Sequence, residues 1–195
     1  MDLSPDGDQP FHDSRGEVHA VVNGELYGHE SYRETLAKDY EFKGHSDCEI
    51  VIALYQHYGI SFLAHLRGEF ALVLWDEKRQ LFFAARDRYG VKSLHYTVVN
   101  GQLLVATEMK AFLAFGWQPE WCIRSLRNGT WQGPSATFFK GVSKVGYIRA
   151  LSSFYGNIQT EISRLNLEIV LLASISAQWS KSHTGTWTIQ TRYHP

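Results

Sequence analysis

The sequence predicts an α+β domain in which mainly antiparallel strands form layered sheets covered by helices. Three observations predict this class. Residues 68–85 hold two apolar runs joined by a polar turn, the pattern of paired, buried strands. Residues 94–99 and 103–106 flank Asn100-Gly101, a strong signal for a hairpin with a type I′ turn. Residues 46–58 place apolar side chains at helical spacing.

The first 45 residues predict a turn-rich start, one strand and one short helix. Residues 1–16 are rich in Ser, Pro, Asp and Gly, which favours loops and hairpins. Residues 17–22 alternate apolar and other side chains as a strand does. Residues 29–37 then predict a helix with an apolar edge formed by Tyr32, Leu36 and Ala37.

Ser46 is predicted to begin the next helix, and Gly59 to end it. Serine followed three residues later by Glu49 is the pattern of a capping box, in which the hydroxyl accepts one backbone N–H while the glutamate reaches back to another. Apolar residues at 50, 51, 53, 54 and 58 recur with the period of a helix. Residues 62–66 add a short amphipathic turn or helix.

The two apolar runs, 70–75 and 81–85, are separated by a polar turn at 76–80. Because both runs are apolar on both of their faces, they suit a sheet that is covered on both sides. Residues 108–115 are predicted to close this part as a helix that ends at Gly116.

Composition limits the function classes. The 195 residues suit one domain with a real core, and 44% hydrophobic with 20% charged residues is typical of a soluble globular protein. A formal charge of −1 argues against a nucleic-acid partner. Residues 165–175 are too short to span a bilayer, and no signal peptide is evident, so we expect a cytoplasmic protein with no membrane partner. The nine histidines and two cysteines show no metal-ligand spacing, so we expect no metal site.

Residues 21–27 read Val-Val-Asn-Gly-Glu-Leu-Tyr, and two interpretations of Asn23-Gly24 are open. The first is a two-residue hairpin turn, for which Asn-Gly is the strongest short signal. The second is a ligand site, because glycine lets another molecule approach the backbone and asparagine brings an amide that both donates and accepts.

Four motifs in order favour the ligand site: Asn-Gly-Glu at 23–25, Ser-Asp-Cys-Glu at 46–49, Arg-Asp-Arg-Tyr-Gly-Val-Lys at 86–92 and Thr-Glu-Met-Lys-Ala at 107–111. From about residue 3 to residue 145, this set resembles the glutaminase domain of class II glutamine amidotransferases, in particular asparagine synthetase. The resemblance implies an N-terminal-nucleophile hydrolase fold, with two antiparallel sheets stacked between helical layers and an incomplete N-terminus. It also implies glutamine as the substrate.

The resemblance assigns roles to four residues. Asn23 and Gly24 match the pair that supplies the oxyanion hole for the tetrahedral intermediate. Glu25 falls where the family places a glutamine-binding carboxylate or its backbone, and Asp47 matches the aspartate that holds the substrate's α-amino group. A second interpretation of Asp47 is an acid that complements a helix N-terminus, and both can hold. No cofactor is implied for this domain, since ATP and Mg²⁺ belong to the family's synthetase domain.

The nucleophile is the main departure from the family. There the catalytic cysteine follows the initiator methionine and its α-amino group is the base, whereas here Asp2 follows Met1. The run that supplies the family's carboxylate-clamping arginine also has no counterpart. We therefore expect a partial domain that releases no ammonia by itself, with a non-catalytic binding or interaction remnant as the alternative. Cys48, without a free α-amine, is expected to be packed and inert, and Cys122 has no supporting neighbours.

Two further segments complete the analysis. Residues 86–92 predict an architectural turn, with an interface role also open. Residues 1–145 are predicted to form the partial glutaminase domain and residues 146–195 a divergent, poorly ordered tail. In place of that tail, family members continue into a synthetase domain, so a synthetase domain or a second copy of the chain is an expected partner.

Overall fold

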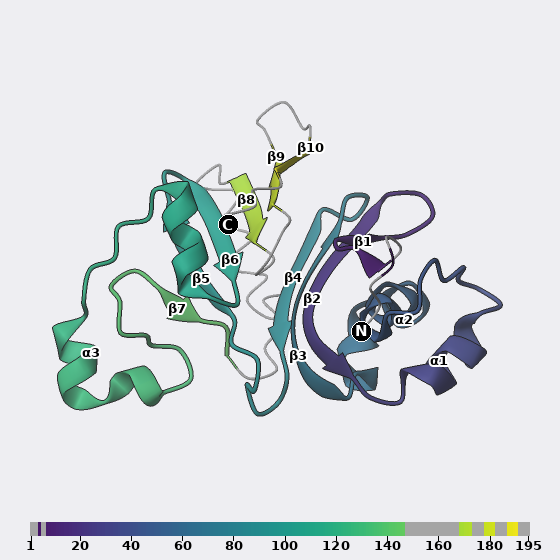
Figure 1. Cartoon of the computed structure of the whole chain (residues 1–195), viewed down its shortest axis with the longest axis horizontal. Coiled ribbons are helices and arrows are strands. Elements are labelled where there is room, and N and C mark those ends of the chain that lie inside the picture. Colours follow the sequence, from purple (N-terminus) through teal and green to yellow (C-terminus); the bar gives the residue numbers. More distant parts are fainter. Residues whose placement is uncertain (1–3, 5–6, 147–167, 173–177, 182–186, 191–195) are drawn as a thin grey trace.

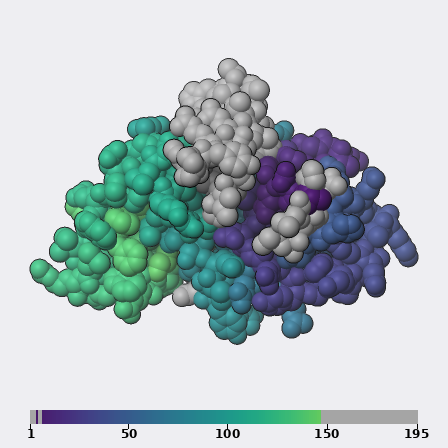
Figure 2. Space-filling model, viewed as in Figure 1, coloured from purple at the N-terminus to yellow at the C-terminus, as the bar shows by residue number. Residues whose placement is uncertain are grey.

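The computed structural model describes residue 4, residues 7–146 and three strands at 168–172, 178–181 and 187–190. Two sheets stand face to face in the centre, and helices cover the first sheet on its outer side (Figure 1). In the space-filling view, the blue segment between β2 and β3 and the green segment that follows β6 lie at opposite ends of an elongated molecule (Figure 2). The predicted α+β class with antiparallel sheets is confirmed.

The first sheet has four antiparallel strands in the order β1-β2-β3-β4. Its strands are β1 (Phe11–His12), β2 (Val18–Leu26), β3 (Gly68–Asp76) and β4 (Leu81–Arg86). The helices beside it are α1 (His29–Leu36), α2 (Ile50–Tyr58) and the 3-10 helices η2 (Asp47–Glu49) and η3 (Gly59–His65).

The second sheet has the order β10-β9-β8-β6-β5-β7. Its strands are β5 (His95–Val99), β6 (Gln102–Ala106), β7 (Ser143–Lys144), β8 (Glu168–Leu172), β9 (Gln178–Lys181) and β10 (Trp187–Gln190). The pair β6–β8 is parallel, and the other pairs are antiparallel. Between β6 and β7 lie η4 (Met109–Phe115), α3 (Ile123–Asn128) and η5 (Thr130–Gln132).

Strand β3 is buried on both faces, as its composition predicts. Leu72 and Leu74 pack in the cluster under α1 and α2, whereas Val73 and Trp75 pack against the second sheet. Successive strand residues point to opposite faces, so an uninterrupted apolar run is what a sheet between two layers requires. Each large side chain buried in this way contributes roughly 1.5–3 kcal/mol.

Several predicted elements are confirmed. The hairpin turn between β5 and β6 has positive φ at both Asn100 (51°) and Gly101 (76°), which is the type I′ geometry. Helix α1 and the end of α2 at Gly59, whose φ is 60°, also lie where the sequence places them.

The interpretation of Asn23-Gly24 as a hairpin turn is wrong. Both residues lie inside the nine-residue strand β2, opposite Ala71 and Phe70 of β3. The pairing runs unbroken from Val18 to Leu26, so the partner strand overrides the local turn preference.

Ser46 begins the second helical segment as predicted, because it is the N-cap residue of η2. Residues 47–49 form a 3-10 turn, and the α-helix follows directly at Ile50. The Ser46 hydroxyl accepts from Cys48 N at 3.3 Å, but the Glu49 carboxylate turns away to bind other groups, so no capping box forms. The helix predicted at 108–115 is the 3-10 helix η4.

The predicted domain boundary stays a prediction. Part of the predicted tail supplies β8, which pairs with β6, while residues 147–167 lie outside the described residues. Among the helices that the structure describes, none combines the length and the apolar character needed to cross a bilayer.

Candidate functional site

A cavity of about 760 Å³ lies along the outer edge of β2, the edge turned away from β3. Residues 21–26 of β2 and the segment 27–30 that follows them line it, together with residues 71–73 of β3. Residues 7–9 and 45–48 line it beside the free edge of β2. Leu94 and Thr107 close the side toward the second sheet. All four residues of the predicted site line this cavity: Asn23, Gly24, Glu25 and Asp47.

Beyond its short pairing with β1, the outer edge of β2 has no described strand beside it, and side chains bond to its backbone groups there. Tyr27 N donates to Arg67 O, toward β3. Backbone groups alternate in direction along a strand, so those of Leu26, Gly24 and Val22 point away from β3. The Gln9 side chain accepts from Val22 N and donates to Val22 O, each at 2.7 Å. By the same alternation, the N–H of Gly24 points to this outer edge and into the cavity.

Gly24 has a backbone conformation and a close neighbour that only glycine tolerates easily. Its φ is +149°, and a Cβ built on it would lie 1.9 Å from Glu69 O and 2.7 Å from the Cα of Phe70. The two strands therefore approach each other here more closely than a side chain allows. This close approach fixes the direction of the Gly24 N–H.

Asn23 presents its side chain to the space between the sheets. Strand alternation puts it on the face shared by Val21 and Ala71, away from the helices. Within the described chain, its side-chain amide makes no hydrogen bond. Both of its N–H donors thus remain available to a ligand in the cavity.

Asp47 is fixed against the C-terminal end of β2. It lies in the first turn of η2, and its Oδ2 accepts from Leu26 N at 2.7 Å. Its Oδ1 has no hydrogen bond among the described residues. The predicted place of Asp47 at a helix start is confirmed, and one carboxylate oxygen remains for a cationic group.

Cys48 is a buried thiol in η2. It is 5% exposed, and burial together with the neighbouring Asp47 raises the pKa of the Cys48 thiol to about 12. Its Sγ lies 3.6 Å from Gly24 O and 3.7 Å from Asp47 Oδ2, so its single proton bonds one of them at a time. Cys122 precedes α3 and does not line the cavity.

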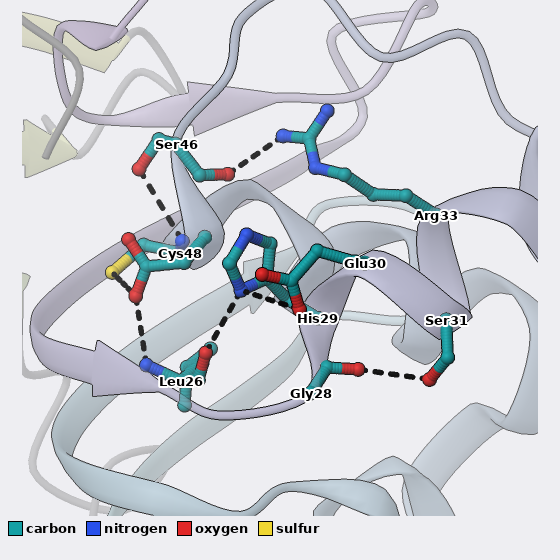
Figure 3. A network of polar contacts seen from close by, with 9 residues as sticks. Leu26, Gly28, His29, Glu30, Ser31, Arg33, Ser46 and Cys48 are labelled. Carbon is teal, nitrogen blue, oxygen red and sulfur yellow. Dashed lines mark hydrogen bonds and ion pairs between the residues drawn. The ribbon is translucent and has the colours of Figure 1, made fainter.

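The predicted residue Glu25 is exposed at the rim of the cavity. The rim also includes two residues of α1 that sequence reasoning missed, the half-buried His29 and the exposed Glu30. The Nδ1 of His29 lies 3.1 Å from Leu26 O and 3.6 Å from Glu30 Oε2 (Figure 3). Gln9 was also missed, because nothing in a turn-rich segment marks a glutamine as the closure of a strand edge.

The turn at 86–92 is built around one carboxylate. The buried Asp87 accepts backbone N–H bonds from Tyr89, Val91 and Lys92 at 2.9–3.1 Å. This geometry agrees with the predicted architectural role, and the predicted interface role stays a prediction. Over the ranges described, no three His, Cys, Asp or Glu side chains gather in a way that could hold a metal ion.

Comparison with known proteins identifies relatives. The family model described as a glutamine amidotransferase domain matches residues 1–114. The Amidase chyE of Penicillium rubens is 68% identical over 145 residues, which is 74% of this chain and 22% of that protein. The Amidase chry2 of Gibberella zeae is 67% identical over the same length and shares. Asparagine synthetase [glutamine-hydrolyzing] 2 of Bacillus subtilis is 30% identical over 94% of this chain and 23% of its own length. The chain thus spans less than a quarter of these relatives.

Proposed function

This chain belongs to the glutamine amidotransferase domain family, and on that premise we propose that its cavity binds free glutamine in the manner of a glutaminase domain. In asparagine-synthetase-like proteins such a domain supplies ammonia to an acceptor, here proposed to be aspartate. The names of the two fungal relatives, both amidases, agree with chemistry at an amide bond.

One observation carries the proposal: a single strand edge holds both ends of the predicted glutamine site. The Gly24 N–H and the Asp47 carboxylate, bound at Leu26, are separated by two strand residues. Two residues of a strand span about 7 Å. In glutamine, four bonds of about 1.5 Å separate the α-nitrogen from the amide carbon, so these atoms lie about 5 Å apart when extended. The spacing therefore suits one glutamine lying along β2.

The roles follow from the chemistry of the two ends. The free oxygen of Asp47 pairs with the substrate ammonium in a charge-assisted hydrogen bond. Asn23 and Gly24 donate to the amide oxygen, and during acyl transfer each such donor is worth roughly 3–4 kcal/mol. Glu25 contributes its carboxylate or its backbone at the rim of the cavity.

Turnover needs a nucleophile, and neither cysteine of this chain fits that role. Cys48 is buried and protonated, while Cys122 lies away from the cavity. We therefore propose that the 195-residue chain binds glutamine without hydrolysing it. The second candidate, a non-catalytic binding or interaction module, is favoured by this same observation.

Further partners are proposed only by class. The Amidase chyE relative is more than three times as long as this chain, so a synthetase-type domain that uses ATP and Mg²⁺ is the proposed consumer of the ammonia, with a second copy of the chain as another partner. The cavity itself is assigned no cofactor. The two free cysteines fit the reducing cytoplasm, which we propose as the compartment.

The test is calorimetric titration of the chain with glutamine, beside an assay of ammonia release. We expect saturable binding that Asp47→Asn weakens at least tenfold, and no ammonia above background. Absence of binding by the unmodified chain would refute the glutamine pocket. Ammonia release that Cys48→Ala abolishes would refute the assignment of Cys48 as an inert thiol.

A further inference from the structure

Arg33 of α1 reaches across to the loop that precedes Asp47. Its Nη1 donates to Gly44 O at 2.9 Å and its Nη2 to Ser46 O at 2.6 Å. The guanidinium also stands 4.4 Å from the centre of the Phe42 ring. One planar group with several fixed donors thus holds two backbone carbonyls of the same loop.

Glu49 completes this arrangement from the other side of the loop. Its carboxylate accepts from Lys43 N at 2.7 Å, from Gly44 N at 3.1 Å and from Arg33 Nη2 at 3.2 Å. Glu49 is 2% exposed and the Arg33 side chain is 19% exposed, so the carboxylate is almost fully desolvated and the guanidinium is mostly buried. A buried carboxylate with this many donors is strongly fixed in place, and loss of one partner would leave a buried charge.

A set of hydrogen bonds links Arg33 to Ser46 and Cys48, two residues that line the cavity on either side of Asp47. Arg33 holds Ser46 O, and the Ser46 hydroxyl accepts from Cys48 N (Figure 3). Asp47 stands between these two residues and accepts from Leu26 N. The direction of the Asp47 carboxylate is therefore set from the neighbouring loop as well as from β2.

We propose that Arg33, together with Glu49, is a positioning residue that holds residues 43–46 and thereby aims the Asp47 carboxylate at the α-ammonium of the ligand. The identity of the ligand in this inference rests on the proposed function. The dependence of the Asp47–Leu26 hydrogen bond on Arg33 does not, and it can be tested without a ligand. Neither residue touches the cavity, so both act only through Asp47.

The test compares Arg33→Lys with a matched control, Arg79→Lys. Both arginines pair with a carboxylate and stand over an aromatic ring. Arg79, however, contacts Asp76 and Tyr55, which do not line the cavity and do not bond to residues 43–47. Lysine keeps the charge but cannot bridge two carbonyls and a carboxylate at once. The first readout is amide hydrogen exchange of Leu26, measured by NMR. Binding of glutamine and of 4-carbamoylbutanoate, which lacks the α-amino group, is the second.

We expect Arg33→Lys to speed Leu26 exchange about tenfold relative to the amides of β3, and Arg79→Lys to leave it unchanged. Affinity for glutamine should fall by a similar factor, while affinity for 4-carbamoylbutanoate stays the same. In an Asp47→Asn background the effect of Arg33→Lys on glutamine affinity should disappear.

The outcomes separate the two proposals. Unchanged Leu26 exchange, or faster exchange shared equally by all β3 amides, would overturn the positioning role whether or not glutamine binds. Faster Leu26 exchange in a protein that binds no glutamine would support the positioning role and refute the proposed function. If Arg33→Lys fails to fold, Glu49→Gln gives the same comparison, because it removes an acceptor from the Lys43 or Gly44 N–H.

Discussion

The closeness of β2 and β3 at Gly24 makes substitution of this glycine the most informative single change. In Gly24→Ala, the new Cβ would meet Glu69 O at 1.9 Å and the Cα of Phe70 at 2.7 Å. These contacts are with backbone atoms, which cannot move aside as the end of a side chain can. The strands must separate locally, and the direction of the residue 24 N–H must change with them.

The expected cost follows from two terms. A non-glycine residue held at φ near +149° is strained by roughly 1–3 kcal/mol. Separating the strands weakens neighbouring ladder bonds and packing by roughly another 2 kcal/mol. We therefore expect Gly24→Ala to lower the free energy of unfolding by about 3–5 kcal/mol, a large share of the roughly 5–15 kcal/mol typical of a domain.

Gly16→Ala is the matched control. Its φ is +66°, and a Cβ there meets nothing within 4 Å, so only the backbone cost of about 1–2 kcal/mol applies. Urea unfolding followed by tryptophan fluorescence measures both variants. If Gly24→Ala costs no more than Gly16→Ala, the close approach of the strands is not what selects glycine at this position.

Three further predictions concern other parts of the chain. Burial, and then His19 beside it at 2.7 Å between the Nδ1 atoms, lowers the pKa of His12 to about 4. The unfolded chain therefore binds more protons than the folded chain between pH 6.5 and 4, so the unfolding free energy should fall by about 1–2 kcal/mol as the pH falls through this window, after allowance for solvent screening. In urea unfolding, His12→Gln should reduce the difference in unfolding free energy between pH 7 and pH 5. Because its pKa is raised to about 12, Cys48 should resist a thiol reagent at pH 8 until the protein unfolds, whereas the partly exposed Cys122 should react at once; rapid labelling of both would contradict the burial of Cys48. Asp87→Ala should cost about 3 kcal/mol by removing three backbone acceptor bonds, and Asp87→Asn less, because its remaining oxygen can keep the two bonds of Oδ1; equal losses in thermal unfolding would count against this.

Much of the fold could be predicted because the strong signals are local. The uninterrupted apolar runs of β3 and β4 and the Asn100-Gly101 turn depend on neighbours in the chain, and the structure has them where the sequence puts them. Asn23-Gly24 carries the same dipeptide but lies inside a strand. The difference is a long partner strand, which dipeptide chemistry does not reveal.

The candidate site divides in the same way. Asn23, Gly24 and Asp47 could be found from motifs, and the structure brings them to one cavity, although their roles stay predictions. Glu49 was assigned to a capping box, but the structure pairs it with Arg33, 16 residues earlier. A contact of this kind depends on how α1 packs beside the 43–46 loop, which no local pattern encodes.

The most direct test of the central claim is an NMR titration of the ¹⁵N-labelled chain with glutamine. The claim is that the outer edge of β2 and the Asp47 carboxylate hold the two ends of one glutamine. We predict saturable shifts of the Gly24 and Leu26 amide resonances, lost in Asp47→Asn. If no resonance shifts, or if resonances shift only at other residues while those of Gly24 and Leu26 stay unchanged, the claim is contradicted.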